Sequence, residues 1–378
     1  MTPQKIHLIA AARPNFMKIA PLYHALSREP WCRAMIVHTG QHYDYNMSDS
    51  FFRDLKLPDP DFHLEVGSGS HAEQTGRVMI EYEKVAVVAR PDWVIVAGDV
   101  NSTLACALVG TKLRIPVVHL EAGLRSGDRS MPEEINRLAT DAIADVLWTP
   151  SADADANLLR ENVPAEKIDR VGNFMIDSYE MLRDSIAAAK MVERLALSPG
   201  QYAVVTLHRP ANVDSADALA SLIAQLSSAS SSLPIVFAVH PRTRKRLHEF
   251  GLMAKLENCA RIRLTEPLGY IEFMSLVSNA AVVVTDSGGV QEETTYLGIP
   301  CLTLRDTTER PITIEEGSNR LVQTHALIDA LGDVMSGRFH SGRGPALWDG
   351  KAAQRSVVAL RTRAIARLAA PKSFGLNP

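Results

Sequence analysis

The chain has 378 residues, of which 46% are hydrophobic and 22% are charged, and its formal net charge is −3. A single core stops growing at roughly 250–300 residues, so the length favours two domains, and the composition is typical of a soluble globular protein. The small negative charge argues against the basic surface that nucleic acid binding requires. Because no apolar run reaches the ~20 residues of a membrane span and the start lacks a signal-peptide layout, we expect a cytoplasmic protein without a membrane partner.

Four cysteines are scattered along the chain without the spacing of metal ligands: Cys32, Cys106, Cys259 and Cys301. Three of them lie in or beside apolar segments, where a reduced cysteine behaves as a small core residue. The sequence therefore predicts reduced thiols, as in a cytoplasmic protein, and no metal site.

In the first half, short apolar runs alternate with longer amphipathic stretches. The expected strands are Ile6–Ala12, Ala34–His38, Trp93–Ala97, Val117–Leu120 and Val146–Thr149. The expected helices between them are Met17–Ser27, Ala72–Ala89, Ser102–Leu113 and Glu133–Ala144. Strand and helix in regular alternation predict a parallel sheet that is covered on both faces.

The alternation restarts after a helical segment near Asp177–Leu197. The next expected strands are Tyr202–Thr206, Ile235–Val239, Arg261–Leu264, Ala281–Thr285 and Pro300–Leu304, and the last expected helix is Ala352–Ala369. We predict the α/β class, with two Rossmann-like, doubly wound parallel-sheet domains facing a central cleft. Residues 1–172 would form the first domain and 173–350 the second, and 351–378 would form a helix that packs back on the first.

Charged side chains of the first half stand where ligands of open parallel sheets bind, beyond the carboxyl ends of strands. Arg13 and Lys18 open the helix after the first strand, and two cations at a helix start suit phosphate. Asp99 follows one strand, Glu121 ends the next, and Glu133 begins a helix. Each could be a cap or a surface charge by itself. Three acids at one sheet edge together predict general acid and base catalysis.

The second half places a histidine at the end of each of two strands, His208 and His240, with Arg209 beside the first. A lone histidine is usually structural, but two histidines and neighbouring arginines at one sheet edge favour an anion site.

A stronger signal follows the strand that ends at Thr285. Gly288 and Gly289 lack side chains, so helix-terminal amides can meet a pyrophosphate, and Ser287 adds a hydroxyl. One turn on, Glu292 or Glu293 could accept from the ribose hydroxyls. The motif differs from the dinucleotide fingerprint and from the P-loop, so neither NAD nor ATP is implied. We read the site as one for a nucleoside diphosphate that carries another group.

These motifs resemble the non-hydrolysing UDP-N-acetylglucosamine 2-epimerases, which have the fold of the GT-B glycosyltransferases. The resemblance runs almost from end to end, through Arg13-Pro14, Thr39-Gly40-Gln41-His42, Gly98-Asp99, His119 to Arg125, Pro132 to Arg137, Val171-Gly172-Asn173, Asp286 to Glu293 and Arg305 to Pro311.

The resemblance implies that UDP leaves by anti elimination, gives a 2-acetamidoglucal and adds back on the other face, without a cofactor. It implies a homodimer and, as the usual destination of the product, precursors of cell-surface polysaccharide. Asp99, Glu121, Glu133 and His208 match the family's catalytic positions. The matches to its positions that bind substrate and UDP are Arg13, Lys18, His240, Ser287, Gly288, Gly289, Glu293 and Arg310.

Gln41, His42 and Arg209 match a second pocket, in which bacterial members bind UDP-N-acetylglucosamine as an activator, although Asp44 replaces a glutamine there. Ala11-Ala12-Arg13-Pro14-Asn15 also departs from the usual Gly-Thr-Arg-Pro-Glu, and relatives with altered openings act on 2,3-diacetamido uronic acids. Such a sugar is one alternative substrate. A GT-B glycosyltransferase, a hydrolysing epimerase and a non-catalytic UDP-sugar sensor are alternative functions.

Overall fold

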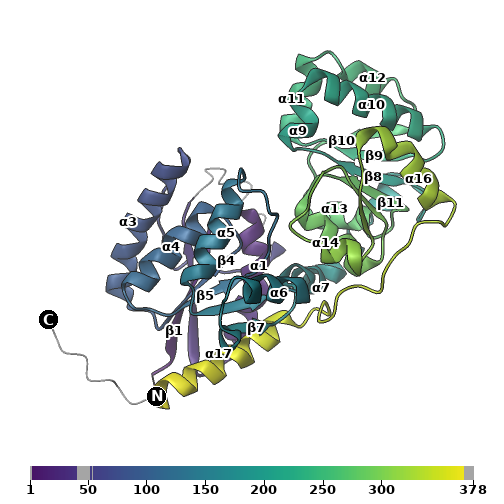
Figure 1. The fold of residues 1–378 in the computed structure, drawn as a ribbon. Coiled ribbons are helices and arrows are strands. Elements are labelled where there is room, and N and C mark those ends of the chain that lie inside the picture. The colour runs from purple at the N-terminus through teal and green to yellow at the C-terminus, as the bar shows by residue number, and fades with distance from the viewer. Residues whose placement is uncertain (1, 41–51, 53, 370–378) are drawn as a thin grey trace. The chain divides into compact units, whose positions relative to one another are not determined.

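The computed structural model describes residues 2–40, 52 and 54–369 (Figure 1). The chain divides into two compact units. Unit 1 consists of Met1–Ser178 and Ala346–Pro378, and unit 2 consists of Tyr179–Pro345. None of the helices formed by the described residues is both long and apolar enough to cross a membrane.

Unit 1 is built on one parallel sheet. Its strands are β1 (Gln4–Ala10), β2 (Cys32–His38), β3 (Phe62–His63), β4 (Trp93–Ala97), β5 (Val117–Leu120), β6 (Val146–Thr149) and β7 (Ile168–Arg170). Its helices are α1 (Arg13–Leu26), α3 (His71–Ala89), α4 (Asn101–Lys112), α5 (Pro132–Ile143), α6 (Ala152–Arg160), the 3-10 turn η1 (Ala165–Lys167), the start of α7 (Phe174–Ala188), and α17 (Ala352–Ala369).

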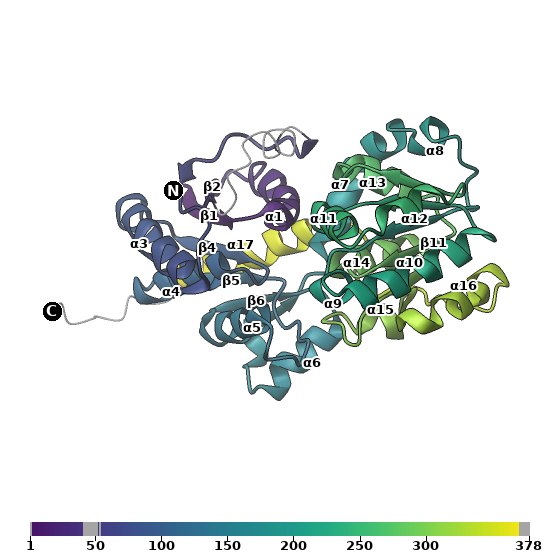
Figure 2. The ribbon, with the colours of Figure 1, turned by 90° about the horizontal axis from the view of Figure 1, so that it is seen from above.

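The strand order of this sheet is β3-β2-β1-β4-β5-β6-β7, and every pair is parallel. Its strands β4, β5 and β6 are buried along their whole length, as expected for a sheet with helices on both faces (Figure 2). Val78, Tyr82 and Ala86 lie four residues apart along α3 and pack in the core of unit 1 with strand residues such as Val94 and Val96. The chain reverses direction across the sheet between β1 and β4, so this is the switch point where ligands bind.

Unit 2 repeats the design with a second parallel sheet. Its strands are β8 (Ala203–Thr206), β9 (Ile235–Ala238), β10 (Ile262–Thr265), β11 (Val282–Thr285), β12 (Cys301–Thr303) and β13 (Asn319–Leu321). Its helices are the end of α7, α8 (Met191–Arg194), α9 (Pro210–Val213), α10 (Ala216–Ser230), α11 (Pro241–Glu249), α12 (Met253–Glu257), α13 (Tyr270–Val277), α14 (Gly288–Leu297), α15 (Ile312–Glu315), the 3-10 turn η2 (Thr324–Ala326) and α16 (Leu327–Met335).

The strand order of unit 2 is β10-β9-β8-β11-β12-β13, again with parallel pairs throughout. Leu219, Leu222 and Leu226 of α10 pack in one buried cluster with Val205 and Phe237 of the sheet. The switch point falls between β8 and β11. The predicted fold class, two doubly wound parallel α/β domains, is confirmed.

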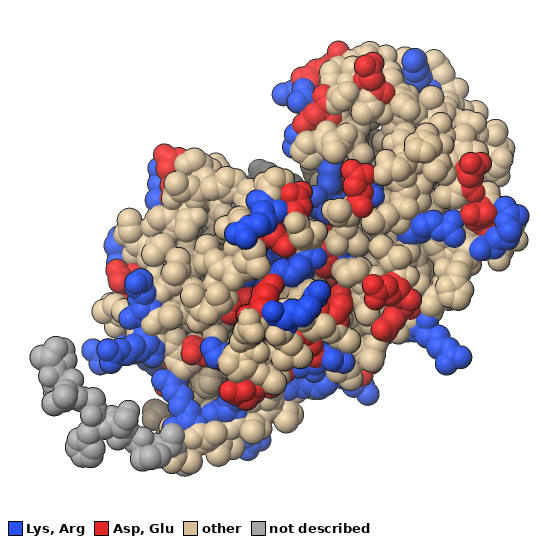
Figure 3. All heavy atoms as spheres, in the orientation of Figure 1, with Lys and Arg blue, Asp and Glu red and all other residues tan. Residues whose placement is uncertain are grey.

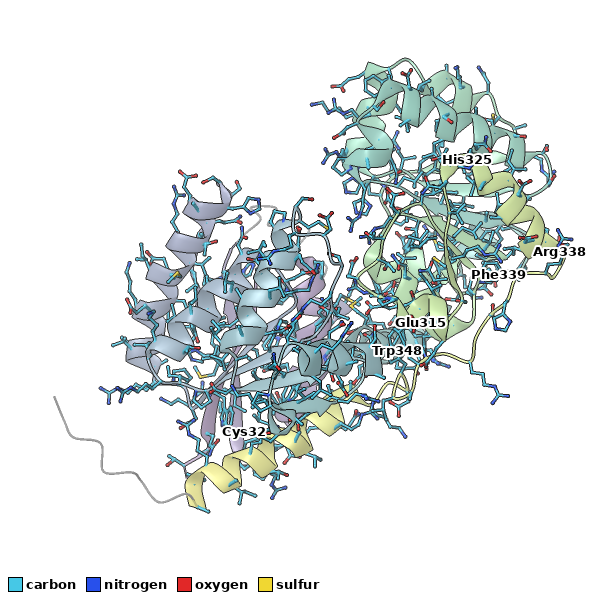
Figure 4. All side chains as sticks on the ribbon, viewed as in Figure 1. Cys32, Glu315, His325, Arg338, Phe339 and Trp348 are labelled. Carbon is cyan, nitrogen blue, oxygen red and sulfur yellow. The ribbon has the colours of Figure 1, made fainter. Side chains whose placement is uncertain are left out.

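The chain returns to unit 1 before α17. The Trp348 indole, labelled in Figure 4, donates a hydrogen bond of 2.9 Å to the carbonyl of Pro150. Asp177 accepts from the backbone amides of Ala352 and Ala353 at 3.0 and 2.7 Å, which satisfies two free amides at the start of α17. These contacts fix α17 on unit 1, where it packs beside α1.

Candidate active site

The switch point of unit 1 is lined by the loops that follow β1, β4 and β5, and these loops converge on Gly98. A Cβ atom at Gly98 would lie 3.1 Å from Lys18 Nζ, 3.4 Å from a Glu121 carboxylate oxygen and 3.5 Å from the Asn15 amide nitrogen. Gly98 also has a φ of +69°, a left-handed conformation that glycine adopts at low cost. Residues up to 106 positions apart in the sequence thus meet around Gly98, which has no side chain.

Lys18 and Glu121 form a buried ion pair within this group. Each side chain is 9% exposed. Glu121 has a φ of +74°, and a non-glycine residue held there costs on the order of 1 kcal/mol or more. The fold therefore holds this carboxylate at a strained position, beside a cation, at the edge where ligands bind.

Asp141 of α5 holds the loop that carries Glu121. Its carboxylate lies 2.5 Å from His119 Nδ1, accepts from the Gly123 amide at 3.0 Å and pairs with Arg125 at 2.8 Å. Burial acts to raise the pKa of Asp141, but His119 and Arg125 outweigh it and keep the pKa below its ordinary value. Asp141 is therefore an ionised anchor for the residues on either side of Glu121.

Asp99 is joined to α5 by charge. Arg137 pairs with the Asp99 carboxylate and, through Nη2, with Glu134 at 2.7 Å. Asn136 donates to the backbone carbonyl of Asp99 at 2.9 Å. The two ions of the Arg137–Glu134 pair are each 3% exposed, whereas the Asp99 side chain is 32% exposed. Asp99 is thus open to a ligand, and Arg137 and Asn136 position it.

The two adjacent acids at the start of α5 differ in environment. Glu134 accepts from the backbone amides of Ser126 and Gly127 at 3.0 Å each. These amides and Arg137 overcome burial and lower the pKa of Glu134. Glu133 is exposed and forms no ion pair with the described residues. Figure 3 shows acidic and basic side chains gathered over α5 and α6.

Glu134, Arg137 and Asp141 are the site-building residues that sequence analysis did not single out. They recur at i, i+3 and i+7 along α5, so they share the helix face that lies against the sheet. That spacing of charged residues on a buried face was the signal that could have found them.

In unit 2, a buried carboxylate organises the switch point. Asp286 is fully buried and accepts hydrogen bonds from the backbone amides of His208 and Arg209 at 3.0 and 2.9 Å. His208 Nδ1 lies 2.9 Å from Asp286, so Nδ1 is the donor and Nε2 is left for another partner. Burial acts to raise the pKa of Asp286, but the hydrogen bond and charge of His208 help to lower it.

His240 lies beside His208, with ring centroids 5.3 Å apart. Its Nδ1 accepts from the Arg242 amide at 3.2 Å and so caps α11. Burial, together with His208, lowers the pKa of His240, which favours a neutral ring with Nε2 as its donor. The two histidines thus offer two nitrogen atoms at the same sheet edge.

The N-terminus of α14 adds backbone donors. Ser287 is the N-cap residue, and Gly288 and Gly289 are the first two residues of the helix, whose amides have no partner within the helix. The space beside Gly289 is open, since no other atom lies within 4 Å of where a Cβ would stand. Glu293, one turn further on, is 3% exposed. A helix start with glycines suits an anion, because amides and dipole point to it.

Arg310 lies behind Gly288 instead of in open space. Its guanidinium pairs with Glu309 at 2.7 Å and with Glu292 at 3.0 Å. A Cβ at Gly288 would lie 2.6 Å from Glu309 and 2.9 Å from Arg310. Burial opposes ionisation of Glu309, but Arg310 and Arg305 prevail and bring its pKa to about 2. This ion-pair cluster packs against Gly288 and so stabilises the start of α14.

Three of the residues that the sequence suggested cannot be placed as side chains. Gln41 and His42 lie outside the described residues, and so does the side chain of Arg13, although Arg13 is the first residue of α1. Arg209, the third member of the suggested second pocket, donates through Nε to the carbonyl of Asp286 at 3.1 Å.

The fold, with acids at one switch point and a helix start with two glycines at the other, is of the GT-B class. The family model for UDP-N-acetylglucosamine 2-epimerase matches residues 24–361. The UDP-N-acetylglucosamine 2-epimerase of Methanocaldococcus jannaschii is 43% identical over 365 residues, covering 93% of this chain and 98% of that protein. The chain therefore belongs to the UDP-N-acetylglucosamine 2-epimerase family, and it is an epimerase.

One solved structure and one further relative bear on the site. A crystal structure of the M. jannaschii enzyme in complex with UDP-N-acetylglucosamine and UDP superposes with a TM-score of 0.85 at 42% identity, covering 95% of this chain and 99% of that one. A UDP-2,3-diacetamido-2,3-dideoxy-D-glucuronate 2-epimerase of Pseudomonas aeruginosa is 41% identical over 322 residues, covering 84% of this chain and 88% of that protein. Similar chains thus act on different UDP-sugars.

Proposed function

We propose that the chain interconverts UDP-N-acetylglucosamine and UDP-N-acetylmannosamine by inverting C2 of the sugar. The observation that carries the proposal is the convergence at Gly98 of Lys18 and the strained Glu121, with Asp99 as the next residue. Carboxylates held at a ligand-binding sheet edge are what proton transfer at a sugar carbon requires. Family membership and the 43% identity to the M. jannaschii enzyme support the reaction and the sugar.

The proposed reaction passes through a 2-acetamidoglucal. In the first half, a carboxylate takes the C2 proton, the electron pair of that bond forms the C1=C2 double bond, and the C1–O bond breaks so that its pair leaves with UDP. In the second half, UDP adds back to C1 and a proton is delivered to the other face of C2. Atoms and electrons balance without an oxidant.

Glu121 is proposed as one proton acceptor, because its carboxylate directly follows β5 at the sheet edge and is held by the ion pair with Lys18. Asp99 and Glu133 are proposed as the other catalytic acids. The partial exposure of Asp99 and the full exposure of Glu133 give both access to substrate and water. His208, held by Asp286 through Nδ1, is proposed to offer Nε2 to the departing diphosphate.

We assign the diphosphate to the start of α14. Ser287 and the amides of Gly288 and Gly289 would bind its oxygens, with His240 as a further donor. Glu293 would accept from the ribose. Arg13 and Lys18 are proposed as additional contacts of the same substrate, and Arg310 would support the helix start. Because UDP leaves and returns, this charge stabilisation would act on the transition states of both halves.

A modified UDP-sugar is the second candidate, favoured by the 41% identity to the P. aeruginosa 2,3-diacetamido uronate epimerase. The C2 chemistry would be unchanged, because the two sugars differ at C3, which carries a second acetamido group, and at C6, which is a carboxylate. A GT-B glycosyltransferase would share the nucleotide site, but it would not need three acids on unit 1.

Two partner proposals rest on the resemblance. Substrate would also act as an activator at a pocket that includes Gln41, His42 and Arg209, and the chain would form a homodimer. A hyperbolic rate curve, or a monomeric mass by light scattering, would contradict the respective proposal.

Proton NMR of the purified protein with UDP-N-acetylglucosamine in D2O tests the function. We expect UDP-N-acetylmannosamine to appear with deuterium at C2, without added cofactor. A parallel sample with the UDP-2,3-diacetamido uronic acid separates the two sugars. Product formed only from the uronic acid would move the proposal to that substrate, and no exchange at C2 in either sample would contradict it.

A further inference from the structure

A pocket of about 470 Å³ lies on unit 1 at the opposite edge of the sheet from the acids. It is formed where β4, β5 and β6 begin, at the end of α4 and along α17. β4 spans five residues at about 3.3 Å each, so roughly 17 Å of strand separates Trp93 from the loop of Asp99. The pocket is therefore distinct from the proposed active site.

The lining of this pocket is of two kinds. Ile115, Pro116, Val146 and Trp93 form an apolar wall. The charged part of the lining consists of Arg114, Arg363, Arg367 and Asp145. Three guanidinium groups face one carboxylate, and Figure 3 shows basic side chains gathered along α17.

The three arginines differ in the ion pairs and hydrogen bonds that they already form. Arg363 is bonded to Asp169 at 2.9 and 3.0 Å, which cancels most of its charge. Arg367 donates to the carbonyl of Asp92 at 3.2 Å and lies 5.8 Å from the centre of the Trp93 ring. Neither contact neutralises it.

The guanidinium of Arg114 is exposed and has no hydrogen-bond or ion-pair partner among the described residues. The opposing carboxylate, Asp145, accepts from the Val117 amide at 2.9 Å through one oxygen. The pocket thus contains two cations, Arg114 and Arg367, that form no ion pair with a carboxylate of the described chain, and one carboxylate, Asp145.

Arg114 also occupies a position where glycine is favoured. It follows the end of α4 with a φ of +58°, and the next residue, Ile115, donates to the carbonyl of Gly110 at 2.9 Å, as in a Schellman motif. An arginine in this left-handed conformation is less stable than glycine would be. This conformational cost falls on a residue whose guanidinium forms no ion pair within the described chain.

We infer that this pocket binds a small organic phosphate, with the phosphate on Arg114 and Arg367 and an apolar body against Ile115, Pro116 and Val146. Planar guanidinium groups match phosphate oxygens in pairs. The volume is in the range of small-molecule sites, about 300–1,000 Å³, and the mixed lining excludes a purely apolar ligand. The ligand is a second one, bound apart from the UDP-sugar.

Isothermal titration with phenyl phosphate tests the inference, with Arg114→Gly as the main variant. The substitution removes a cation and relieves the left-handed conformation together, so lost binding cannot be attributed to unfolding. Arg90→Gly is the matched control, because Arg90 ends α3 in the same conformation, with a φ of 49°, and lies outside the pocket. Tryptophan fluorescence follows the stability of unit 1, since all four tryptophans (Trp31, Trp93, Trp148 and Trp348) belong to it.

We expect Arg114→Gly to weaken phenyl phosphate about tenfold or more, the scale of one lost charge-assisted hydrogen bond. Arg90→Gly should change the affinity less than about twofold, and both variants should unfold at or slightly above the wild-type temperature. Arg367→Gln should weaken binding as Arg114→Gly does. Any binding at the diphosphate site would be equal in all four proteins.

The class of ligand is tested by two smaller probes. Inorganic phosphate should bind more weakly than phenyl phosphate, and phenol should not bind at the Arg114-dependent site. Equal affinities of wild type and Arg114→Gly for phenyl phosphate, or an equal loss in Arg90→Gly, would overturn the inference. Inorganic phosphate binding as tightly as phenyl phosphate would overturn the organic part of it.

Discussion

The two switch points share one backbone plan and carry opposite chemistry. The six strands of the unit 2 sheet follow the same order as β3-β2-β1-β4-β5-β6 of unit 1, so β4 of unit 1 corresponds to β11 of unit 2. After β4 comes Gly98 and then an acid paired with Arg137, whereas after β11 comes a buried acid and then a helix start with Ser287 and two glycines. The fold thus provides two similar sheet edges, and their side chains differ in chemistry.

The two edges also use buried carboxylates differently. In unit 1 the carboxylates that meet cations include Asp99, which is partly exposed and can reach a ligand. In unit 2, Asp286 and Glu309 are buried and hold a histidine, arginines and backbone amides in place. We therefore expect turnover to depend on the acids of unit 1 and UDP affinity to depend on unit 2.

The largest expected effect is on turnover, from Glu121→Gln. Removing the charge removes a proton acceptor, and general acid–base groups contribute about 10²–10⁴-fold, so turnover should fall roughly 10³-fold. UDP affinity, which we assign to unit 2, should change less than about twofold. The rate is measured by NMR and the affinity by calorimetry.

Glu81→Gln is the matched control for that prediction, because Glu81 of α3 also pairs with a lysine, Lys84, but its side chain is 40% exposed. It should leave both quantities unchanged. A Glu121→Gln enzyme with normal turnover would remove Glu121 from the mechanism, and a loss of UDP binding would contradict the division of roles between the units.

The second effect is on the stability of unit 2, from Glu309→Gln. A pKa lowered from 4.5 to about 2 corresponds to about 3 kcal/mol, at about 1.36 kcal/mol per pKa unit. Because the folded pKa is depressed, this stabilisation is present above pH 4.5 and is lost as the pH falls towards 2. Urea unfolding should show the variant less stable by about 3 kcal/mol at pH 7, with the difference shrinking below pH 4.5.

Glu315→Gln, at an exposed acid of α15 labelled in Figure 4, is the control and should match the wild type at every pH. Circular dichroism follows both units, while tryptophan fluorescence reports unit 1 and should not change with Glu309→Gln. A difference that persists to pH 2 would mean that packing, not charge, makes Glu309 important.

The third prediction contrasts neighbouring acids of α5. Glu133→Gln should lower turnover about 10²-fold without loss of stability, because the residue is exposed. Glu134→Gln should lower the free energy of unfolding of unit 1 by about 1–3 kcal/mol, because a donating NH2 group replaces one of the two oxygens that accept from Ser126, Gly127 and Arg137, and Arg137 loses a buried ion-pair partner. Denaturation and rate assays on both variants test this contrast. A stable but inactive Glu134→Gln variant, with an unstable but active Glu133→Gln variant, would show that the two roles are reversed.

The central strands could be predicted from the sequence because burial on both faces leaves an uninterrupted apolar run. The expected bounds of β4, β5 and β6 agree with the structure, and so do those of α17. β3, β7 and β13 were not predicted, because strands of two or three residues at or near a sheet edge are too short to show a pattern.

The sequence could predict where the candidate site residues lie, but not which residues they contact. Asp99, His208 and Ser287 follow strands, and a strand end is visible in sequence. Arg137 meets Asp99 across 38 residues, and only the packing of α5 on the sheet brings them together. The positive φ of Glu121 was equally invisible, because nothing in the residue type favours it.

The smallest expected effects come from the two adjacent glycines of α14, and they test the anion site most directly. Alanine at Gly289 has open space and a better helix propensity, so Gly289→Ala should leave unit 2 as stable or about 0.5–1 kcal/mol more stable. The methyl group would stand where we place the diphosphate, so UDP affinity should fall about tenfold.

Gly288→Ala should instead destabilise unit 2. Its Cβ would lie 2.6 Å from Glu309 and 2.9 Å from Arg310, so these side chains must shift. We expect a loss of about 1–3 kcal/mol, the scale of overpacking. A Gly289→Ala variant that is stable and binds UDP normally would exclude the start of α14 as the diphosphate site. If Gly288→Ala weakened UDP while Gly289→Ala did not, the ligand would instead lie on the Arg310 side of the helix.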